Sequence, residues 1–252
     1  MKRRLLALVG LVVLAGLAGC FGPSEVPEED LTGNATYDWD RNAAAAYDLS
    51  RSTYAAVFAV DNRSTLEVHD RDALGVEAAV DISALQFRFQ NGTVVNATHR
   101  NLSATLEQRQ TVISLPARSG QVAYSARRSG KQFSTPVVVP GRQTITLPPG
   151  TRVGVPLLSQ VNPADYATSV ADGRMTVAWA NQTGGTLTVH YYLQRDLVLF
   201  SLLLLVTLTL GVGGSVYYLR QIRRLEDERE DLGLEVETED DPRDRGPPPG
   251  MR

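Results

Sequence analysis

The feature that most constrains this chain is a long apolar run near its carboxy terminus. Leu197–Leu219 contains 23 residues and no Asp, Glu, Lys or Arg. As an α-helix the run would be ~34 Å long, enough to cross the ~30 Å hydrocarbon core of a bilayer. Tyr191 and Tyr192 precede the run and Tyr217 and Tyr218 close it, as in the aromatic belts at membrane interfaces. The run therefore predicts one transmembrane helix over residues 197–219.

The charges on either side of this run predict which flank lies in the cytoplasm. Three arginines follow the run within five residues, whereas the preceding flank has Arg195 beside Asp196. Positive charge favours the cytoplasmic side of a membrane. We therefore expect a single-pass protein of the cell membrane, with residues 21–196 extracellular. The tail, residues 220–252, is expected to be cytoplasmic, acidic and largely disordered.

The first 20 residues are typical of an export signal. A basic start precedes the 13-residue apolar run Leu5–Leu17, which is too short to cross a bilayer but has signal-peptide length. The run ends in Leu17-Ala18-Gly19-Cys20, which resembles a lipobox, and Cys20 is the only cysteine of the chain. We therefore expect residues 1–20 to form a signal peptide and Cys20 to be lipidated. The alternative is an ordinary cleavage site with an incidental thiol, and the export route, general or twin-arginine, stays open.

The region between the two apolar runs divides into a short linker and a β-rich domain. Residues 21–36 are acidic and rich in Pro, Gly and small polar residues, which predicts a flexible linker. Over residues 37–196, short β-branched and aromatic runs alternate with turn residues. This pattern predicts a mainly β fold, an antiparallel, immunoglobulin-like β-sandwich of about nine strands. Two smaller sandwiches in tandem stay open as an alternative.

Several strands can be placed individually. Asn91-Gly92 lies between Leu85–Gln90 and Thr93–Val95, and an Asn-Gly pair between such runs predicts a tight hairpin. The other early strands are expected at Thr53–Val60, Thr65–His69, Ala104–Leu115, Val122–Ala126, Gln132–Val139 and Thr144–Leu147. We expect Gln132–Val139 to pair back onto the preceding strand across Ser129-Gly130.

The last part of the domain is expected to contain one helix and one hairpin. Asn162-Pro163 resembles an N-cap followed by proline at the first helical position, with Asp165 in the first turn and Gly173 as the stop. Met175–Ala180 and Thr186–Leu193 are expected to form a final hairpin that leads into the membrane helix.

The asparagines predict a glycosylated exterior. Six of the eight stand in Asn-X-Ser/Thr triplets, at Asn34, Asn62, Asn91, Asn96, Asn101 and Asn181. All six lie on the side predicted to be extracellular, which is the pattern of N-glycosylation. Asn34 and Asn181 are the best candidates, because they are expected in a linker and in a hairpin loop. Asn91 has a second explanation, because its turn also favours asparagine.

The composition and two segments point to a group of organisms and to a family. Lysine occurs only at positions 2 and 131, against 23 arginines, and Ala, Val, Asp and Thr are abundant, as in proteins of salt-loving archaea. Asn62–Val68 and Phe87–Val95 carry a resemblance to an uncharacterised haloarchaeal family whose members pair a lipobox with a carboxy-terminal membrane helix. The resemblance implies a surface lipoprotein and brings no known activity.

The residues that usually carry chemistry form no recognisable set. His69, His99 and His190 are the only histidines, and no two of them have metal-ligand spacing. His69-Asp70-Arg71-Asp72 lacks the further oxygen ligands of a calcium loop, so an exposed turn is the preferred interpretation. The net charge of −3 argues against a nucleic-acid partner. We therefore expect no catalytic residue, cofactor or metal, and no enzyme activity.

Three hypotheses about function follow. The first is a structural, adhesion or binding role in the cell envelope, with envelope glycans or another membrane protein as partner. The second is an accessory subunit of a membrane transport or secretion complex, because Gly211, Gly214 and Ser215 form a small-residue face on the predicted membrane helix. The third is a surface hydrolase whose site is assembled from distant strands. The oligomeric state stays open.

Overall fold

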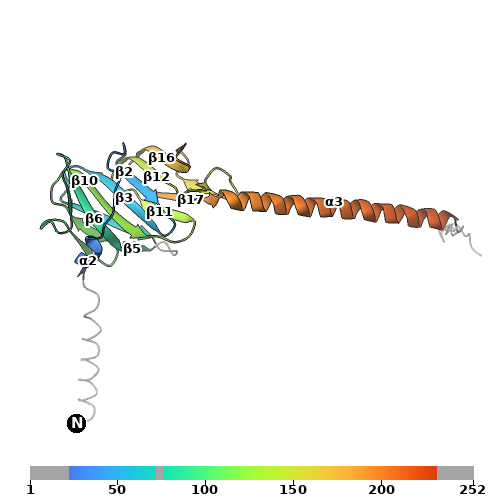
Figure 1. Cartoon of the computed structure of the whole chain (residues 1–252), viewed down its shortest axis with the longest axis horizontal. Helices are drawn as coiled ribbons and strands as arrows, with labels where there is room; N and C mark the ends of the chain where they lie inside the picture. The colour runs from blue at the N-terminus through green and yellow to red at the C-terminus, as the bar shows by residue number, and fades with distance from the viewer. Residues whose placement is uncertain (1–22, 72–75, 232–252) are drawn as a thin grey trace, which may run out of the picture. The chain divides into compact units, whose positions relative to one another are not determined.

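The computed structural model of the chain describes residues 23–71 and 76–231. This part is mainly β and ends in one long helix, which confirms the predicted fold class (Figure 1). The chain divides into two compact units, Met1–Asp196 and Leu197–Arg252. The predicted signal run and Cys20 lie outside the described residues.

The larger sheet of the domain has eight strands, in the order β15-β16-β12-β2-β3-β10-β6-β7. Their bounds are β2 Ala45–Leu49, β3 Thr53–Val60, β6 Ile82–Phe89, β7 Val94–Asn96, β10 Gly120–Arg127, β12 Gly141–Thr146, β15 Ala167–Ala171 and β16 Arg174–Gln182. Neighbouring strands are antiparallel except β2 and β12, which run parallel. Eight strands in one sheet exceed the four and three of an immunoglobulin constant domain.

The remaining strands form smaller sheets. A five-stranded sheet has the order β1-β8-β9-β4-β5, a three-stranded sheet the order β11-β17-β14, and β13 pairs with β18. Their bounds are β1 Ser24–Glu25, β4 Thr65–Arg71, β5 Glu77–Ala79, β8 Ser103–Leu106, β9 Thr111–Ser114, β11 Gln132–Pro136, β13 Thr151–Arg152, β14 Gln160–Asn162, β17 Thr186–His190 and β18 Tyr192–Leu193.

One continuous apolar core joins these sheets. Successive side chains of a strand point to opposite faces, and in β3 Tyr54 and Phe58 enter the main core whereas Val57 joins a small cluster on the other face. The five-stranded and three-stranded sheets also contribute buried residues to the main core, for example Ile113 and Leu187. The five-stranded and three-stranded sheets therefore pack on one face of the larger sheet, and the domain is a single sandwich.

The two ends of the sandwich differ in what they carry. At the far end, β3 finishes at Val60 and β6 at Phe89, both level with Gly120 of β10. At the opposite end, which we call the exit end, β11 begins level with His190 at the end of β17. The chain leaves the domain there, because β18 is followed directly by the helix α3, Gln194–Asp231.

Helix α3 has 38 residues and contains the uncharged run. It is the one helix among the described residues that is long and apolar enough to cross a membrane. Its hydroxyl side chains bond back to the helix backbone, Thr207 to the Leu203 carbonyl at 2.9 Å and Ser215 to the Gly211 carbonyl at 2.8 Å. Such bonds satisfy hydroxyl groups inside an apolar environment.

The segment expected to be a flexible linker packs against the domain, which corrects the expectation for residues 23–36. Ser24 and Glu25 add a strand to β8, and Glu28–Leu31 form the short helix α2. Val26 and Leu31 are buried in the main core. The prediction was wrong because it used the average polarity of this acidic, Pro-containing segment. Two of its apolar side chains, Val26 and Leu31, cover the edge of the core.

The prediction of a helix after Asn162-Pro163 is wrong, because this stretch forms a hairpin. Strand β15 pairs with β16, with Ala171 opposite Arg174, so Asp172 and Gly173 form a two-residue turn. Both turn residues have positive φ, 51° and 74°, as a tight hairpin requires. Gly173 therefore closes a hairpin rather than stopping a helix.

Two strand pairings also differ from expectation. Strand β11 pairs with β17 rather than with β10, and β16 and β17 lie in different sheets instead of forming the final hairpin. The run Ala104–Leu115 is two strands, joined where Glu107 donates its backbone N–H to Gln110. The β10–β11 and β16–β17 connections cross between the layers of the sandwich, whereas short-range signals favour pairing between neighbours in sequence. Tyr191, expected at the membrane interface, is buried in the domain core.

Candidate functional site

A polar hollow of about 450 Å³ lies on the outer face of the larger sheet. Strands β2, β3 and β10 form its floor, and the segment before β2 forms its rim. The lining includes Tyr37, Asp38, Arg41, Asp48, Thr53 and Ser125. We call it the outer-face hollow.

The rim segment is fixed to the sheet by its aromatic and backbone groups. Tyr37 packs on Val57, and its hydroxyl donates to the Ala84 carbonyl at 2.6 Å. The ring of Trp39 meets that of Tyr37 edge to face, with centroids 5.8 Å apart. The Gln121 side chain donates to the Trp39 carbonyl at 2.9 Å. The rim is therefore an ordered part of the domain.

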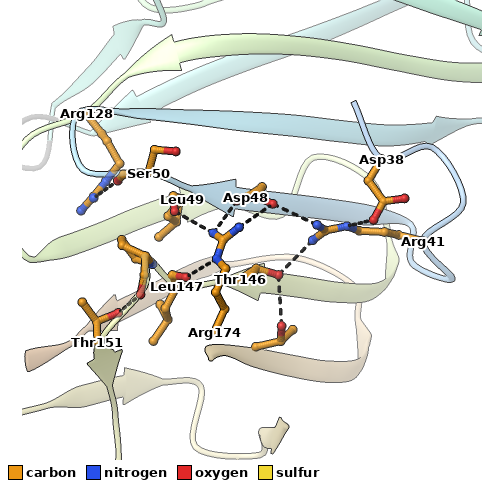
Figure 2. Close-up of polar contacts among 12 residues, drawn as sticks. Asp38, Arg41, Asp48, Leu49, Ser50, Arg128, Thr146, Leu147, Thr151 and Arg174 are labelled. Atoms are coloured by element: carbon orange, nitrogen blue, oxygen red, sulfur yellow. Dashed lines mark hydrogen bonds and ion pairs between the residues drawn. The ribbon is translucent and has the colours of Figure 1, made fainter. Parts of the chain in front are cut away.

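Two arginines converge on Asp48 at the edge of the hollow (Figure 2). The Arg174 guanidinium donates to both carboxylate oxygens of Asp48. Arg41 Nη2 donates to Asp48 Oδ2 at 3.0 Å, and Arg41 Nε donates to Asp38 Oδ2 at 2.9 Å. The network, which we call the arginine clasp, ties the rim to β2 and β16.

Three further hydrogen bonds join the arginines of the clasp to neutral oxygens. Arg174 donates to the carbonyls of Leu147 at 3.0 Å and Leu49 at 2.9 Å, and Arg41 Nη1 donates to Thr146 Oγ1 at 2.9 Å. The two carboxylates balance the two guanidinium charges. Because each charged group already has partners, the clasp is suited to holding strands together rather than to binding a free anion. The exposed Thr53 hydroxyl and the half-buried Ser125 at the hollow suit contact with a hydroxyl-rich ligand.

Beneath the hollow, the core holds a cluster of tyrosines that stay neutral far into alkaline pH. Burial raises the pKa of Tyr47 to about 12, against the lowering effect of its hydrogen bond with Thr135. Burial likewise raises the pKa of Tyr54 and Tyr124 well above 10, and in the rim it raises the pKa of Tyr37 to about 12. At neutral pH these hydroxyls are hydrogen-bonding groups and not bases.

The structure does not bring the histidines together at the hollow. His69 lies on β4 with Nε2 3.8 Å from Glu77 Oε1, His99 lies beside the ring of Phe89, and His190 is exposed at the end of β17. In the described part of the chain, no three His, Cys, Asp or Glu side chains are placed to hold a metal ion. Asp72 of the predicted exposed turn lies outside that part.

All six asparagines of the glycosylation triplets are exposed: Asn34, Asn62, Asn91, Asn96, Asn101 and Asn181. Asn42 and Asn162, outside such triplets, are exposed as well, so exposure alone does not select sites. The Asn96 side-chain oxygen accepts from the Thr98 hydroxyl at 2.6 Å, which joins the first and third residues of that triplet. Asn62 and Asn91 follow the far-end termini of β3 and β6.

On α3, the small residues line a shallow groove. Thr207, Gly211 and Ser215 lie along it, flanked by Leu204, Leu208, Val212 and Val216, and its volume is about 470 Å³. Gly214, which the sequence grouped with Gly211 and Ser215, is not among the lining residues. The groove is a surface against which another helix can pack.

Sequence reasoning missed the arginine clasp. One signal was present, because Asp48 interrupts the otherwise apolar strand β2, and a buried or half-buried carboxylate needs a partner. The partner Arg174 lies 126 residues away in sequence, and nothing in a single sequence identifies it.

Residues 41–237 match a protein family described as a family of unknown function (DUF5803). The matched range begins at the clasp residue Arg41 and includes the sandwich from β2 onward and α3. No curated protein matches the chain.

Proposed function

The chain belongs to this family of unknown function, and from its own architecture we propose that it is a membrane-anchored cell-surface protein. Its role is structural, adhesive or binding in the cell envelope, without catalysis. Residues 21–196 are extracellular in this proposal and the acidic tail is cytoplasmic.

The observation that carries the proposal is the direct connection between sandwich and apolar helix. Strand β18 ends at Leu193 and α3 begins at Gln194, so no linker separates them. The Gln194 backbone N–H donates to the Gly150 carbonyl at 3.0 Å, and Lys131 Nζ lies 2.7 Å from Asp196 Oδ2. A helix that crosses the bilayer from Leu197 holds such a domain at the membrane surface.

Features of the sequence extend this proposal to modification and origin. Lipidation of Cys20 gives the amino end a second membrane attachment. One acyl chain alone binds a membrane only marginally, so this attachment adds to the anchoring by α3. Exposed triplet asparagines support N-glycosylation of the domain. The lysine-poor, arginine-rich composition supports a haloarchaeal source, where molar salt shortens the Debye length to ~3 Å and leaves recognition to short-range contacts.

We place the binding surface at the outer-face hollow, with an envelope glycan as the favoured ligand. Its hydroxyl groups and the half-exposed Asp38 can exchange hydrogen bonds with a sugar at short range. The fixed rim supplies a preorganised surface, which lowers the entropic cost of binding.

Chemical crosslinking in intact cells, followed by mass spectrometry, tests the proposed role. We expect envelope components to be crosslinked to the domain, with fewer crosslinks in Thr53→Arg, which adds a large side chain to the floor of the hollow. Thr168→Arg, on the exposed strand β15, is the matched control and should leave them unchanged. Recovery of uncrosslinked chain alone would remove the binding role. The same spectra report the masses on Cys20 and on the asparagines.

The groove on α3 favours a second function, that of an accessory subunit of a membrane transport or secretion complex. Its test is co-purification in mild detergent with a multi-pass protein. We expect loss of the partner in Gly211→Leu and in Ser215→Leu, which fill the groove, and retention in Gly213→Leu, outside the lining residues. Purification as a monomer under these conditions would contradict it.

A further inference from the structure

The loop between β13 and β14, residues 153–159, carries an apolar side chain that nothing in the domain covers. Leu157 is 96 % exposed, whereas the next most exposed large apolar side chain among the described residues of the sandwich, Val76, is 56 % exposed. Pro156 beside it is exposed as well. Burial of this side chain against an apolar surface would be favourable, because it would remove apolar area from water.

Both roots of this loop are attached to the residues that lead into α3. Arg152 of β13 is opposite Tyr192, and Gln160 of β14 is opposite His190. The chain from His190 to Leu197 consists of four extended residues and one partial helical turn, so the distance between these two residues is at most ~18 Å. Leu157 is five residues from Arg152 and three from Gln160, so it extends at most ~10 Å from the nearer root, and the headgroup layer is ~5–8 Å thick. The loop is therefore rooted within ~18 Å of the start of the apolar run of α3, and a loop of this length can span the remaining distance to the headgroup layer.

The loop is held in one shape by its own hydrogen bonds. The Val155 carbonyl accepts from the Leu158 N–H, the Ser159 N–H and the Ser159 hydroxyl, each at 2.9 Å. The Ser159 hydroxyl oxygen in turn accepts from the Gly154 N–H at 2.9 Å, and Gly154 has a φ of +117°, which favours glycine. Internal pairing lowers the cost of moving backbone groups out of water, and Pro156 has no N–H to desolvate.

Basic side chains accompany the loop at the exit end. Lys131 and Arg195 are exposed there, and Arg152 forms the first root of the loop. One acid, Asp196, pairs with Lys131. An apolar tip with basic neighbours matches the order of a membrane surface, where acyl chains lie beneath headgroup phosphates.

We infer that residues 153–159 form a membrane-contact loop, with Leu157 inserted at the boundary between headgroups and acyl chains of the bilayer that α3 crosses. The loop acts as a third attachment beside the helix and the Cys20 lipid and limits the tilting of the sandwich. This inference rests on the proposed membrane anchoring.

The test uses the full chain in nanodiscs made with phosphatidylglycerol that carries bromine on its acyl chains. Bromine quenches tryptophan only at close range, so Leu157→Trp reports whether the tip enters the bilayer. Wild-type protein supplies the background of Trp39 and Trp179. Val94→Trp is the matched control, because Val94 is a partly exposed apolar residue on β7, paired with Arg88 near the far end.

We expect the emission of Leu157→Trp to shift to the blue and to be lost in brominated lipid, with no such loss in Val94→Trp. A blue shift without bromine quenching would show that the tip contacts protein and would overturn the inference. Equal quenching of both variants, or of neither, would overturn it too. Extraction of the chain by alkaline carbonate would instead refute the membrane anchoring itself, so the two failures are distinguishable.

Discussion

Removal of the Asp48 carboxylate is the sharpest test of the arginine clasp. In Asp48→Ala, Arg174 loses its bidentate partner and Arg41 loses one of its two carboxylates. Breaking a fully buried ion pair costs about 3–5 kcal/mol. The side chains here are partly exposed, 31 % for Asp48 and 27 % for Arg174, so water replaces part of the lost interaction. We therefore expect a loss of about 2–3 kcal/mol in the free energy of unfolding.

Thermal unfolding of the full chain in detergent, followed by circular dichroism, measures this loss. A domain of this size loses ~2–4 °C in Tm per kcal/mol, so Asp48→Ala should lower Tm by roughly 4–12 °C. Asp40→Ala is the control, because Asp40 forms an exposed ion pair with Arg88 at 2.8 Å, and such pairs contribute less than about 1 kcal/mol. If Asp48→Ala lowered Tm no more than Asp40→Ala, the clasp would not hold the strands together.

Three further predictions concern the fold. Burial raises the pKa of Tyr47 from 10.0 to about 12. The contribution of the neutral Tyr47 side chain to the free energy of unfolding is therefore complete below pH 10 and is lost as the pH rises through 12. In an alkaline titration followed by tyrosinate absorbance, tyrosine ionisation should coincide with unfolding. The folded variant Tyr47→Phe should unfold at a higher pH than the wild type. Gly173→Ala should lower the free energy of unfolding by about 1–2 kcal/mol, because the φ of Gly173 is +74°. Gly184 has no positive φ, so Gly184→Ala should lower it less in the same thermal assay. Leu31→Ala should lower the free energy of unfolding by about 2–5 kcal/mol and make residues 23–36 more sensitive to protease. If this segment were a flexible linker, the substitution would change neither quantity.

Short-range signals in the sequence were sufficient for much of the fold. The bounds of β3, Thr53–Val60, and the hairpin at Asn91-Gly92 follow from alternation and turn chemistry, and the structure confirms both. Asp172-Gly173 carried the same kind of turn signal, but the helix-start signal at Asn162-Pro163 was preferred. The error shows that a local helix cap carries little weight without an apolar helical face behind it.

Long-range pairing could not be predicted from the sequence. The parallel pairing of β2 with β12 and the pairing of β11 with β17 depend on how layers close over the core, and alternation within a strand does not contain that information. The same limit applies to the candidate site. The clasp joins residues from three distant segments, and only the isolated charge of Asp48 in an apolar strand hinted at it.

The location of the domain is tested most directly through its single lysine. Lys131 is the only lysine between residue 21 and the carboxy terminus, and its side chain is 51 % exposed. A membrane-impermeant amine reagent applied to intact cells should therefore modify Lys131 to the same extent as in lysed cells. Modification of Lys131 only after lysis would place the sandwich in the cytoplasm and contradict the account.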